Sequence, residues 1–185
     1  MTVKEHMIRM VPKSLELPAR YQYNKFLGRL ERETEIIETI VTNTRRCVDI
    51  GANVGLYTYR FSRLFQQVES FEPIPRCAQI IASSELKNVN LHRVALSSRL
   101  GHAMLQIPVT GGPGATAMAS LSNQFQNAEL LAVELRTLDS FCFTEVDLVK
   151  IDVEGHELEV LNGGVETFAR ESPTIMVEIE QRHHP

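Results

Sequence analysis

The spacing of hydrophobic residues changes several times along the chain, and these changes predict alternating helices and strands. Between Leu27 and Val41, apolar residues recur at a spacing that places them on one side of a helix. Later in the chain, short apolar runs bounded by polar residues or glycine are typical of buried strands. Such strands are expected at Cys47–Ile50, Val68–Phe71, Val89–Leu96, Asp147–Val153 and Thr174–Ile179.

Further helices and shorter strands are expected between these segments. Apolar residues at helical spacing predict helices at Leu56–Phe65, Pro75–Leu86 and Glu157–Ala169. Weaker alternation predicts short strands at His102–Ile107 and Leu131–Leu135. A mobile loop, suited to act as a lid, is expected at Pro108–Ser120, which is rich in Gly, Thr, Ala and Ser.

The order of these elements predicts the fold class and the domain organisation. Strands that alternate with helices imply right-handed βαβ crossovers and a largely parallel sheet, so the fold class is α/β. Residues 1–26 contain Pro12 and Pro18 and are expected to be an irregular or partly helical lead-in. We expect an N-terminal lead-in and helix over residues 1–44 and the α/β domain over residues 45–185. Ligands of such sheets bind beyond the carboxyl ends of the strands.

The composition is that of a globular protein of one domain. The chain has 185 residues, 43% of them hydrophobic, and a net charge of −4. A mildly acidic balance argues against a general nucleic-acid binder, which usually has a basic face. The sequence contains no run of about 18 or more apolar residues, so no membrane span is expected. The first residues lack the apolar core of a signal peptide. The three scattered cysteines form no CxxC pair, so thiols in the cytoplasm are expected.

The first group of candidate residues follows the strand at Cys47–Ile50, in the segment VDIGANVG. Gly51 and Gly55 permit backbone conformations and close approaches that a Cβ would block. The segment leads directly into a helix, whose free N–H groups favour an anionic group. Asp49, at the end of the strand, could receive an ammonium group. The segment therefore suits the zwitterionic end of an amino acid, although a tight turn without a ligand is the alternative.

The second candidate is Glu72, at the end of the next strand. It follows Gly51 by 21 residues, and an acidic residue at about this spacing is placed to accept hydrogen bonds from ribose hydroxyls. A surface Glu-Pro turn is the alternative, but the loop and the carboxylate together are more specific than either alone. The spacing G-x-x-x-G, without a central glycine, favours S-adenosylmethionine over a nicotinamide dinucleotide. No G-K-[ST] follows, which excludes a P-loop.

The third candidate group is IDVEGHE, from Ile151 to Glu157. Its carboxylates and imidazole could perform acid–base chemistry or bind a metal. Asp152, at the strand end, is interpreted as functional, whereas Glu157 suits a helix cap. His156 is either catalytic or simply exposed at the start of a helix. No metal ligands are predicted, because an octahedral oxygen site needs more ligands than Asp152 and Glu154 supply.

Three other polar features are interpreted as structural. Asn90 and Lys150 lie in predicted strands, where the long side chain of Lys150 could reach the surface or pair with a carboxylate. The pair His183–His184 is expected to be a solvated tail.

Taken together, these motifs resemble FkbM-type methyltransferases, a branch of the class I S-adenosylmethionine-dependent fold. The resemblance extends from about Arg46 to Glu180. It is carried by VDIGANVGLYT (48–58), FEPIP (71–75), VALSS with the following Gly101 (94–101), ELRTLDSF (134–141), DLVKIDVEGHELEVLNGG (147–164) and IMVEIE (175–180).

The resemblance implies a Rossmann-like three-layer sandwich that binds S-adenosyl-L-methionine. The loop that contains Asp49, Gly51, Ala52, Asn53 and Gly55 would hold the methionine part. Glu72 would bind the ribose, and Val94 and Ala95 would border the adenine. Asp152 would also contact the cofactor, and together with Glu154 and His156 it would form the catalytic site. Asp152 or His156 would remove the acceptor's proton.

The resemblance also implies an acceptor class. The family mostly methylates hydroxyl oxygens of sugars, polyketides and related metabolites, so a small-molecule or glycan acceptor is expected. The family fold usually continues after the Thr174–Ile179 strand with a helix and an antiparallel pair of strands, which this sequence is expected to lack. A homodimer could cover the open edge. The alternative function is a cofactor-binding protein of the same fold that is non-catalytic or completed by a partner.

Overall fold

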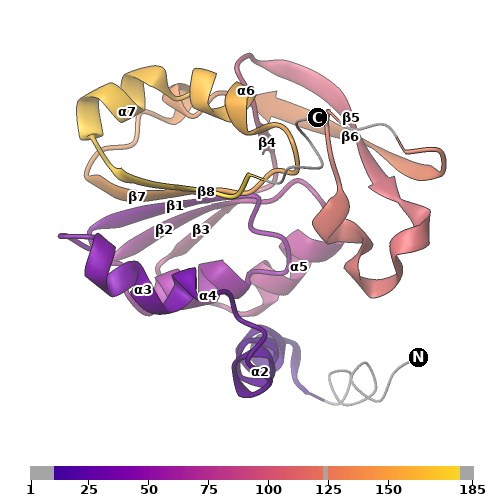
Figure 1. The fold of residues 1–185 in the computed structure, drawn as a ribbon, viewed down its shortest axis with the longest axis horizontal. Helices are drawn as coiled ribbons and strands as arrows, with labels where there is room; N and C mark the ends of the chain where they lie inside the picture. The colour runs from indigo at the N-terminus through magenta and orange to yellow at the C-terminus, as the bar shows by residue number, and fades with distance from the viewer. Residues whose placement is uncertain (1–10, 123–124, 180–185) are drawn as a thin grey trace.

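A parallel sheet forms the centre of the protein, whose computed structural model describes residues 11–122 and 125–179. The strand order is β3-β2-β1-β7-β8 (Figure 1). The strands are β1 (Arg46–Ile50), β2 (Gln67–Phe71), β3 (Val89–His92), β7 (Val146–Ile151) and β8 (Thr174–Val177). The register places Asp49 of β1 beside Ser70 of β2 and Lys150 of β7. The α/β class and the parallel sheet predicted from the sequence are confirmed.

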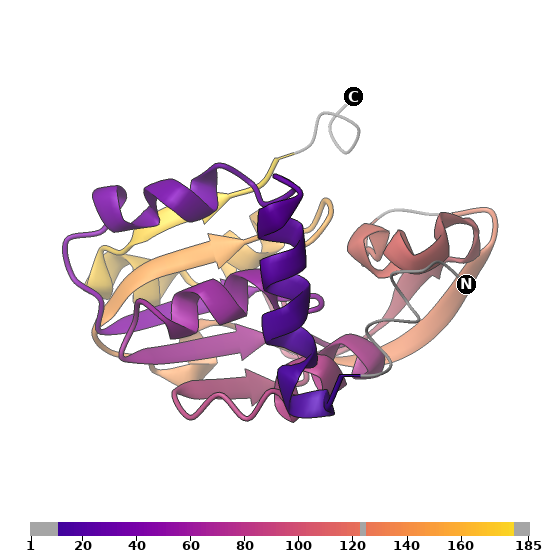
Figure 2. The ribbon, with the colours of Figure 1, turned by 90° about the horizontal axis from the view of Figure 1, so that it is seen from below.

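Helices cover both faces of this sheet and complete the predicted three layers (Figure 1). On one face lie α3 (Glu33–Ile40), α4 (Leu56–Ser62) and α5 (Pro75–Ser83), and on the other lie α6 (Glu157–Asn162) and α7 (Val165–Glu171). The additional helix α2 (Lys13–Phe26) crosses the outer side of α4 and α5 (Figure 2). Leu17 of α2 is fully buried, and the ring of Tyr21 lies 5.0 Å from that of Tyr59 in α4.

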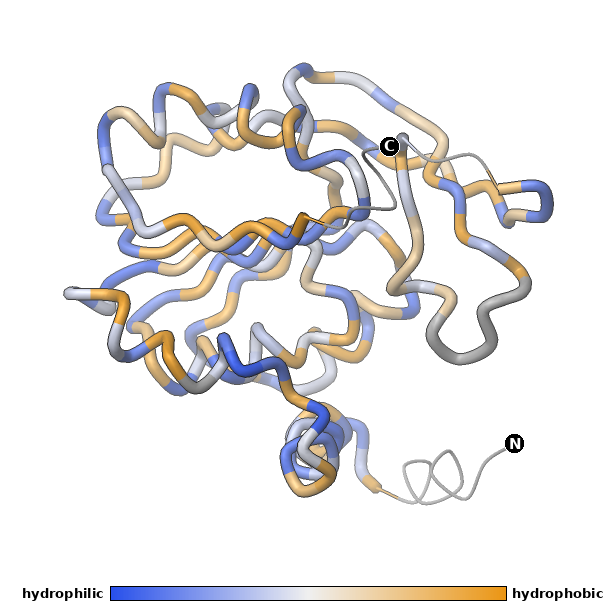
Figure 3. Tube along the Cα trace, viewed as in Figure 1, coloured by the Kyte–Doolittle hydropathy of each residue, from blue (hydrophilic) through white to orange (hydrophobic). Residues whose placement is uncertain are grey.

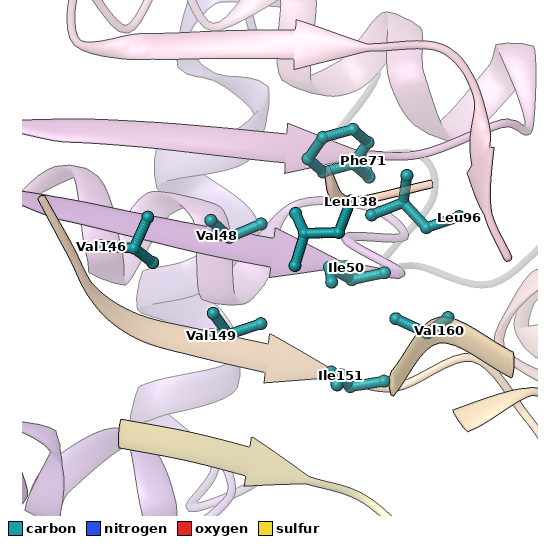
Figure 4. Packing of buried hydrophobic residues seen from close by; sticks show 9 residues of the cluster. All are labelled: Val48, Ile50, Phe71, Leu96, Leu138, Val146, Val149, Ile151 and Val160. Carbon is teal, nitrogen blue, oxygen red and sulfur yellow. The ribbon is translucent and has the colours of Figure 1, made fainter. Parts of the chain in front are cut away.

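The main core fills the space between the sheet and the second helical layer. Figure 4 shows its buried cluster, which includes Val48 and Ile50 of β1, Val149 and Ile151 of β7, and Val160 of α6. Hydrophobic and polar residues alternate along parts of the central strands in Figure 3, and β2, for example, has the sequence QVESF. Each side chain of the buried cluster contributes about 1.5–3 kcal/mol on full burial.

A smaller sheet projects from one end of the central one (Figures 1 and 2). Its order is β4-β6-β5, and its strands are β4 (Ala95–Leu96), β5 (Gly101–Pro108) and β6 (Ala128–Arg136). The 3₁₀ segment η1 (Val109–Met118) follows β5, and the short η2 (Asp139–Phe141) follows β6. The predicted strand Val89–Leu96 is therefore wrong as one element, because its last residues pair with β6 instead of continuing β3.

The N-terminal elements agree with the expectation at one point and differ from it at another. Residues 13–26 form one continuous helix, α2, despite Pro18, within the lead-in that was expected to be irregular or partly helical. The predicted helix from Leu27 to Val41 is wrong in its first half, because Gly28 adopts a φ of +61° directly after α2 and α3 begins only at Glu33. The domain division at residue 45 stays a prediction.

Two further segments also differ from the expectation. The predicted helix Glu157–Ala169 is two helices, because the chain breaks at Gly163 and Gly164. A Cβ at Gly163 would lie 2.0 Å from the carbonyl oxygen of Ser97, so this segment passes directly against the backbone that follows β4. The segment predicted as a mobile loop, Pro108–Ser120, contains η1 and buries Ala115 and Ser120. This packing counts against a loose lid. The pair His183–His184 lies outside the described residues.

No helix within residues 11–122 and 125–179 has the length and apolar character needed to cross a membrane.

Candidate functional site

A cavity of about 370 Å³ lies at the carboxyl ends of the central strands. This volume is in the range of small-molecule sites, and its location follows the rule for parallel sheets. The cavity brings together most of the residues singled out in the sequence, whose segments lie far apart along the chain. These are Gly51, Ala52, Asn53, Glu72, Val94, Ala95, Asp152, Glu154 and His156.

The loop between β1 and α4 forms one wall of the cavity. Gly51 has a φ of +78°, and a Cβ there would lie only 1.8 Å from the carbonyl oxygen of Asp152. The N–H groups of Gly51 and Ala52 both donate to the carbonyl oxygen of Phe71, at 3.1 and 3.0 Å. Gly51 therefore permits the close approach of the β1, β2 and β7 ends, which no other residue would allow.

Glu72 joins this loop to the end of β2. Its carboxylate accepts hydrogen bonds from the N–H groups of Asn53 and Ile74, both at 2.7 Å. Burial raises the pKa of Glu72 from its usual 4.5 to about 7, although these two hydrogen bonds act in the opposite direction. Each carboxylate oxygen has more than one lone pair, so acceptor capacity remains for hydroxyl groups of a ligand.

Asp49 and Gly55 are not among the residues that line the cavity. Their contacts are with the helices packed against the loop. A Cβ at Gly55 would lie 2.7 Å from Cγ1 of Ile81, so this glycine permits α4 to pack closely on α5. Asp49 is fully buried, and its Oδ2 accepts a hydrogen bond from Thr58 at 2.6 Å. The ammonium group of Lys150 lies near its Oδ1.

Lys150 connects the buried Asp49 with the cavity. Its Nζ lies 2.9 Å from Oδ2 of Asp152 and 3.9 Å from Oδ1 of Asp49. The same Nζ lies 4.6 Å from the centre of the Tyr57 ring. Burial alone would lower the pKa of Lys150, but the charges of the two aspartates outweigh burial and raise it. Lys150 therefore carries a positive charge at neutral pH.

The loop between β7 and α6 presents Asp152, Glu154 and His156 to the cavity. Glu154 and Gly155 adopt φ angles of +53° and +91°, which turn the chain sharply between the strand and the helix. The N–H of Gly155 donates to the carboxylate of Glu157 at 2.8 Å. This contact holds the turn before α6, and no side-chain hydrogen bond among the described residues caps the helix; Glu157 lies in its first turn, where the helix dipole favours a carboxylate.

His156 joins two walls of the cavity. Its Nε2 lies 3.0 Å from Oγ of Ser97, and its Nδ1 lies 2.9 Å from Oγ of Ser122. Burial lowers the pKa of His156 and thereby favours the neutral ring, although the charges of Glu159 and Glu157 act in the opposite direction. Because both ring nitrogens already have hydroxyl partners, Asp152 is the more accessible of the two candidate bases.

The comparison with known protein families decides the identity of this fold. Residues 49–185 match the family described as the methyltransferase FkbM domain. The chain belongs to this family. Membership implies S-adenosylmethionine as the methyl donor.

Two curated relatives agree with this assignment. Methyltransferase sdnD of Sordaria araneosa is 28% identical over 152 residues, which cover 63% of this chain and 59% of sdnD. The 2-O-methyltransferase NoeI of Sinorhizobium fredii (strain NBRC 101917 / NGR234) is 29% identical over 144 residues, which cover 66% of this chain and 58% of NoeI. The chain thus spans less than two thirds of the length of either relative.

A solved structure supports the fold. The crystal structure of methyltransferase FkbM from Methylobacillus flagellatus KT at 2.20 Å superimposes with a TM-score of 0.53 and 14% identity. The match covers 90% of this chain and 44% of that one. At this identity, the likeness concerns the fold alone.

This FkbM domain also lines its cavity with residues that the sequence analysis did not select. Arg29, Glu31 and Thr34 come from the N-terminal segment, and nothing in the local sequence pattern indicates that they reach the strand ends. Glu178 also lines the cavity and follows β8 directly, so the strand-end rule could have found it. Lys150 was interpreted as structural, although a lysine within an apolar strand is itself a signal of a buried charge.

The site shows no arrangement of metal ligands among the residues described. Within residues 11–122 and 125–179, no group of three or more His, Cys, Asp or Glu side chains is placed to hold a metal ion.

Proposed function

We propose that this chain is an S-adenosylmethionine-dependent methyltransferase that acts on a hydroxyl oxygen of a sugar, a polyketide or a related metabolite. The observation that carries the proposal is the placement of two carboxylates, Glu72 and Asp152, on one cavity, beyond the ends of the two strands that flank β1. One is buried and suited to hydroxyl groups of a cofactor, whereas the other is partly exposed and suited to an acceptor.

The residues of the cavity fit the proposed cofactor. Glu72 has the acceptor capacity for a pair of ribose hydroxyls. Val94 and Ala95 provide an apolar surface for the adenine ring, and the loop from Gly51 to Asn53 approaches closely enough to hold the methionine part. A nucleoside site of this kind needs few polar groups on a mainly apolar wall.

Asp152 is placed to act as the general base. Its side chain is 28% exposed, so it is accessible from the cavity and still restrained by Lys150. When bound, S-adenosylmethionine would supply an electrophilic methyl group on a sulfonium sulfur, and its transfer to the acceptor oxygen would leave S-adenosylhomocysteine, a thioether. Asp152 takes the hydroxyl proton of the acceptor, while the cavity walls hold the acceptor in line. Positioning is the main task of the protein, because the leaving group is already a good one.

The relatives support transfer to oxygen. NoeI is described as a 2-O-methyltransferase. A hydroxyl acceptor also agrees with the carboxylates that line the cavity, where Glu154 and Glu178 join Asp152.

The experiment that tests this function measures release of S-adenosylhomocysteine with a panel of hydroxyl acceptors that includes monosaccharides, oligosaccharides and polyketide alcohols. We expect turnover by the wild-type chain and a loss of about 10²-fold or more in Asp152→Asn, the usual contribution of a general base. Binding of S-adenosylhomocysteine, followed by calorimetry, should change little. Glu166→Gln, on the exposed side of α7, is the matched control.

Two outcomes would contradict the proposal. Unchanged turnover in Asp152→Asn would remove Asp152 from the role of base. Tight binding of S-adenosylhomocysteine without turnover on any acceptor of the panel would favour the alternative, a cofactor-binding protein without catalytic activity.

A further inference from the structure

We propose that Lys150 is a positioning residue, whose ammonium group holds the carboxylate of Asp152 in the direction from which it takes the acceptor's proton. The inference rests on the function proposed above and assigns a role to a residue that the sequence pattern marks only as structural.

The surroundings of Lys150 fix its ammonium group in space. The side chain is 5% exposed and rises from β7 between the Asp49 carboxylate and the ring of Tyr57. Asp152 follows two residues later, so its side chain leaves the backbone on the same face as that of Lys150. The ammonium group therefore meets the Asp152 carboxylate at 2.9 Å, and both residues line the cavity.

The consequence concerns the freedom of Asp152. A partly exposed aspartate at the end of a strand can rotate about two side-chain bonds, and only some of the resulting directions face the acceptor. An ion pair with a group that cannot move selects one of these directions. The reaction needs such selection, because a displacement of about 1 Å at a reacting group can reduce the rate by about 10²-fold.

A simpler role for Lys150 has to be separated from this one. Asp49 is completely buried, and its Oδ1 has no hydrogen-bond partner among the described residues. Lys150 could be present only to offset that buried charge. Replacing Lys150 alone would leave Asp49 without compensation, and a loss of activity could then follow from poor folding.

A charge-balanced double variant separates the two roles. Asp49→Asn serves as the reference, because it removes the buried carboxylate and keeps the pair between Lys150 and Asp152. Asp49→Asn/Lys150→Met removes both buried charges and leaves Asp152 without its partner. Turnover, thermal unfolding and binding of S-adenosylhomocysteine are measured for both variants and for the wild-type chain, and crystal structures of both variants give the direction of Asp152.

We expect the double variant to fold and to bind S-adenosylhomocysteine as the reference does. Its kcat should be about 10²-fold below that of the reference, with the KM for the acceptor changed far less. Asp152 should keep its direction in Asp49→Asn and rotate in the double variant. A role in charge compensation alone would predict equal kcat and an unchanged Asp152 in the two variants, and either result would overturn the inference.

The outcomes for the proposed function and for Lys150 are distinguishable. Absence of turnover by the wild-type chain would contradict the proposed function. In that case, the direction of Asp152 in the two crystal structures decides the role of Lys150. If wild-type turnover is present and the variants are equal, only the role of Lys150 is wrong.

Discussion

At the scale of single residues, the position of a carboxylate along its strand determines its role. Glu72 was predicted from its spacing after the glycine loop, and it lines the cavity. Asp49 has an equally suggestive sequence position, but it points toward α4, where Thr58 binds it, while its neighbours Val48 and Ile50 face the opposite helices. Sequence spacing indicates that a residue lies near a strand end. It does not indicate whether the side chain reaches the cavity: Asp49 shares a face of the sheet with Lys150, but only Lys150 lines the cavity.

The burial of Glu72 predicts a pH dependence of stability. Because its pKa of about 7 in the folded chain exceeds the usual 4.5, the folded state binds more protons than the unfolded state between these values. Stability should therefore fall as the pH rises from about 4.5 to about 7, by about 3 kcal/mol for this group. Urea unfolding of the ligand-free chain at pH 5 and pH 8 measures the effect.

Glu72→Gln is the variant that isolates this contribution, since an amide of the same size does not titrate. The decline in the free energy of unfolding between pH 5 and pH 8 should be smaller in Glu72→Gln than in the wild-type chain. Asp49, whose pKa burial also raises, is present in both proteins and cancels in the comparison. An equal decline in both proteins would show that Glu72 does not titrate in this range.

At the scale of elements, the sequence predicts regular segments better than the breaks between them. The central strands were predicted because each contains a short run of mainly apolar residues bounded by polar residues or glycine. The prediction of a single helix at Glu157–Ala169 was wrong, because the apolar periodicity of the sequence continues across Gly163 and Gly164. The physical reason for the break, the approach of Gly163 to the backbone at Ser97, depends on a segment more than sixty residues earlier in the chain.

This close approach predicts a large effect of a small substitution. Gly163→Ala would place a methyl group against the carbonyl oxygen of Ser97, which belongs to the backbone and cannot rotate away. We expect a loss of about 2 kcal/mol or more in the free energy of unfolding, within the usual range for overpacking. Chemical unfolding measures it. Asn162→Ala, at the exposed neighbouring position, is the control and should change stability by less than about 0.5 kcal/mol. Equal stability of Gly163→Ala and the control would mean that the two segments separate easily.

At the scale of the whole molecule, the cavity depends on segments that no local pattern connects. The connection between α2 and α3 brings Glu31 to the hydroxyl of Tyr57, which donates a hydrogen bond to it. The N-terminal segment thus lines a site built mainly from residues 50–156. Its contribution follows from tertiary packing, in which α2 buries Leu17 against α4 and α5, and the sequence alone gives no sign of it.

The edge of the sheet supports a prediction about assembly. Among the residues described, β8 pairs with β7 alone, and its Ile175 is 42% exposed. A strand with free N–H and C=O groups and an exposed apolar side chain favours pairing with another chain. We therefore expect the protein to form a homodimer through β8, which light scattering over a wide range of concentrations would detect.

Ile175→Lys should weaken the association, because it places a charge in each copy at the contact. Leu130→Lys makes the same change at an exposed position of β6, the middle strand of the smaller sheet, and should leave the association as it is. A wild-type chain that stays monomeric at every concentration would contradict the role of this edge, and equal weakening by both substitutions would place the contact elsewhere.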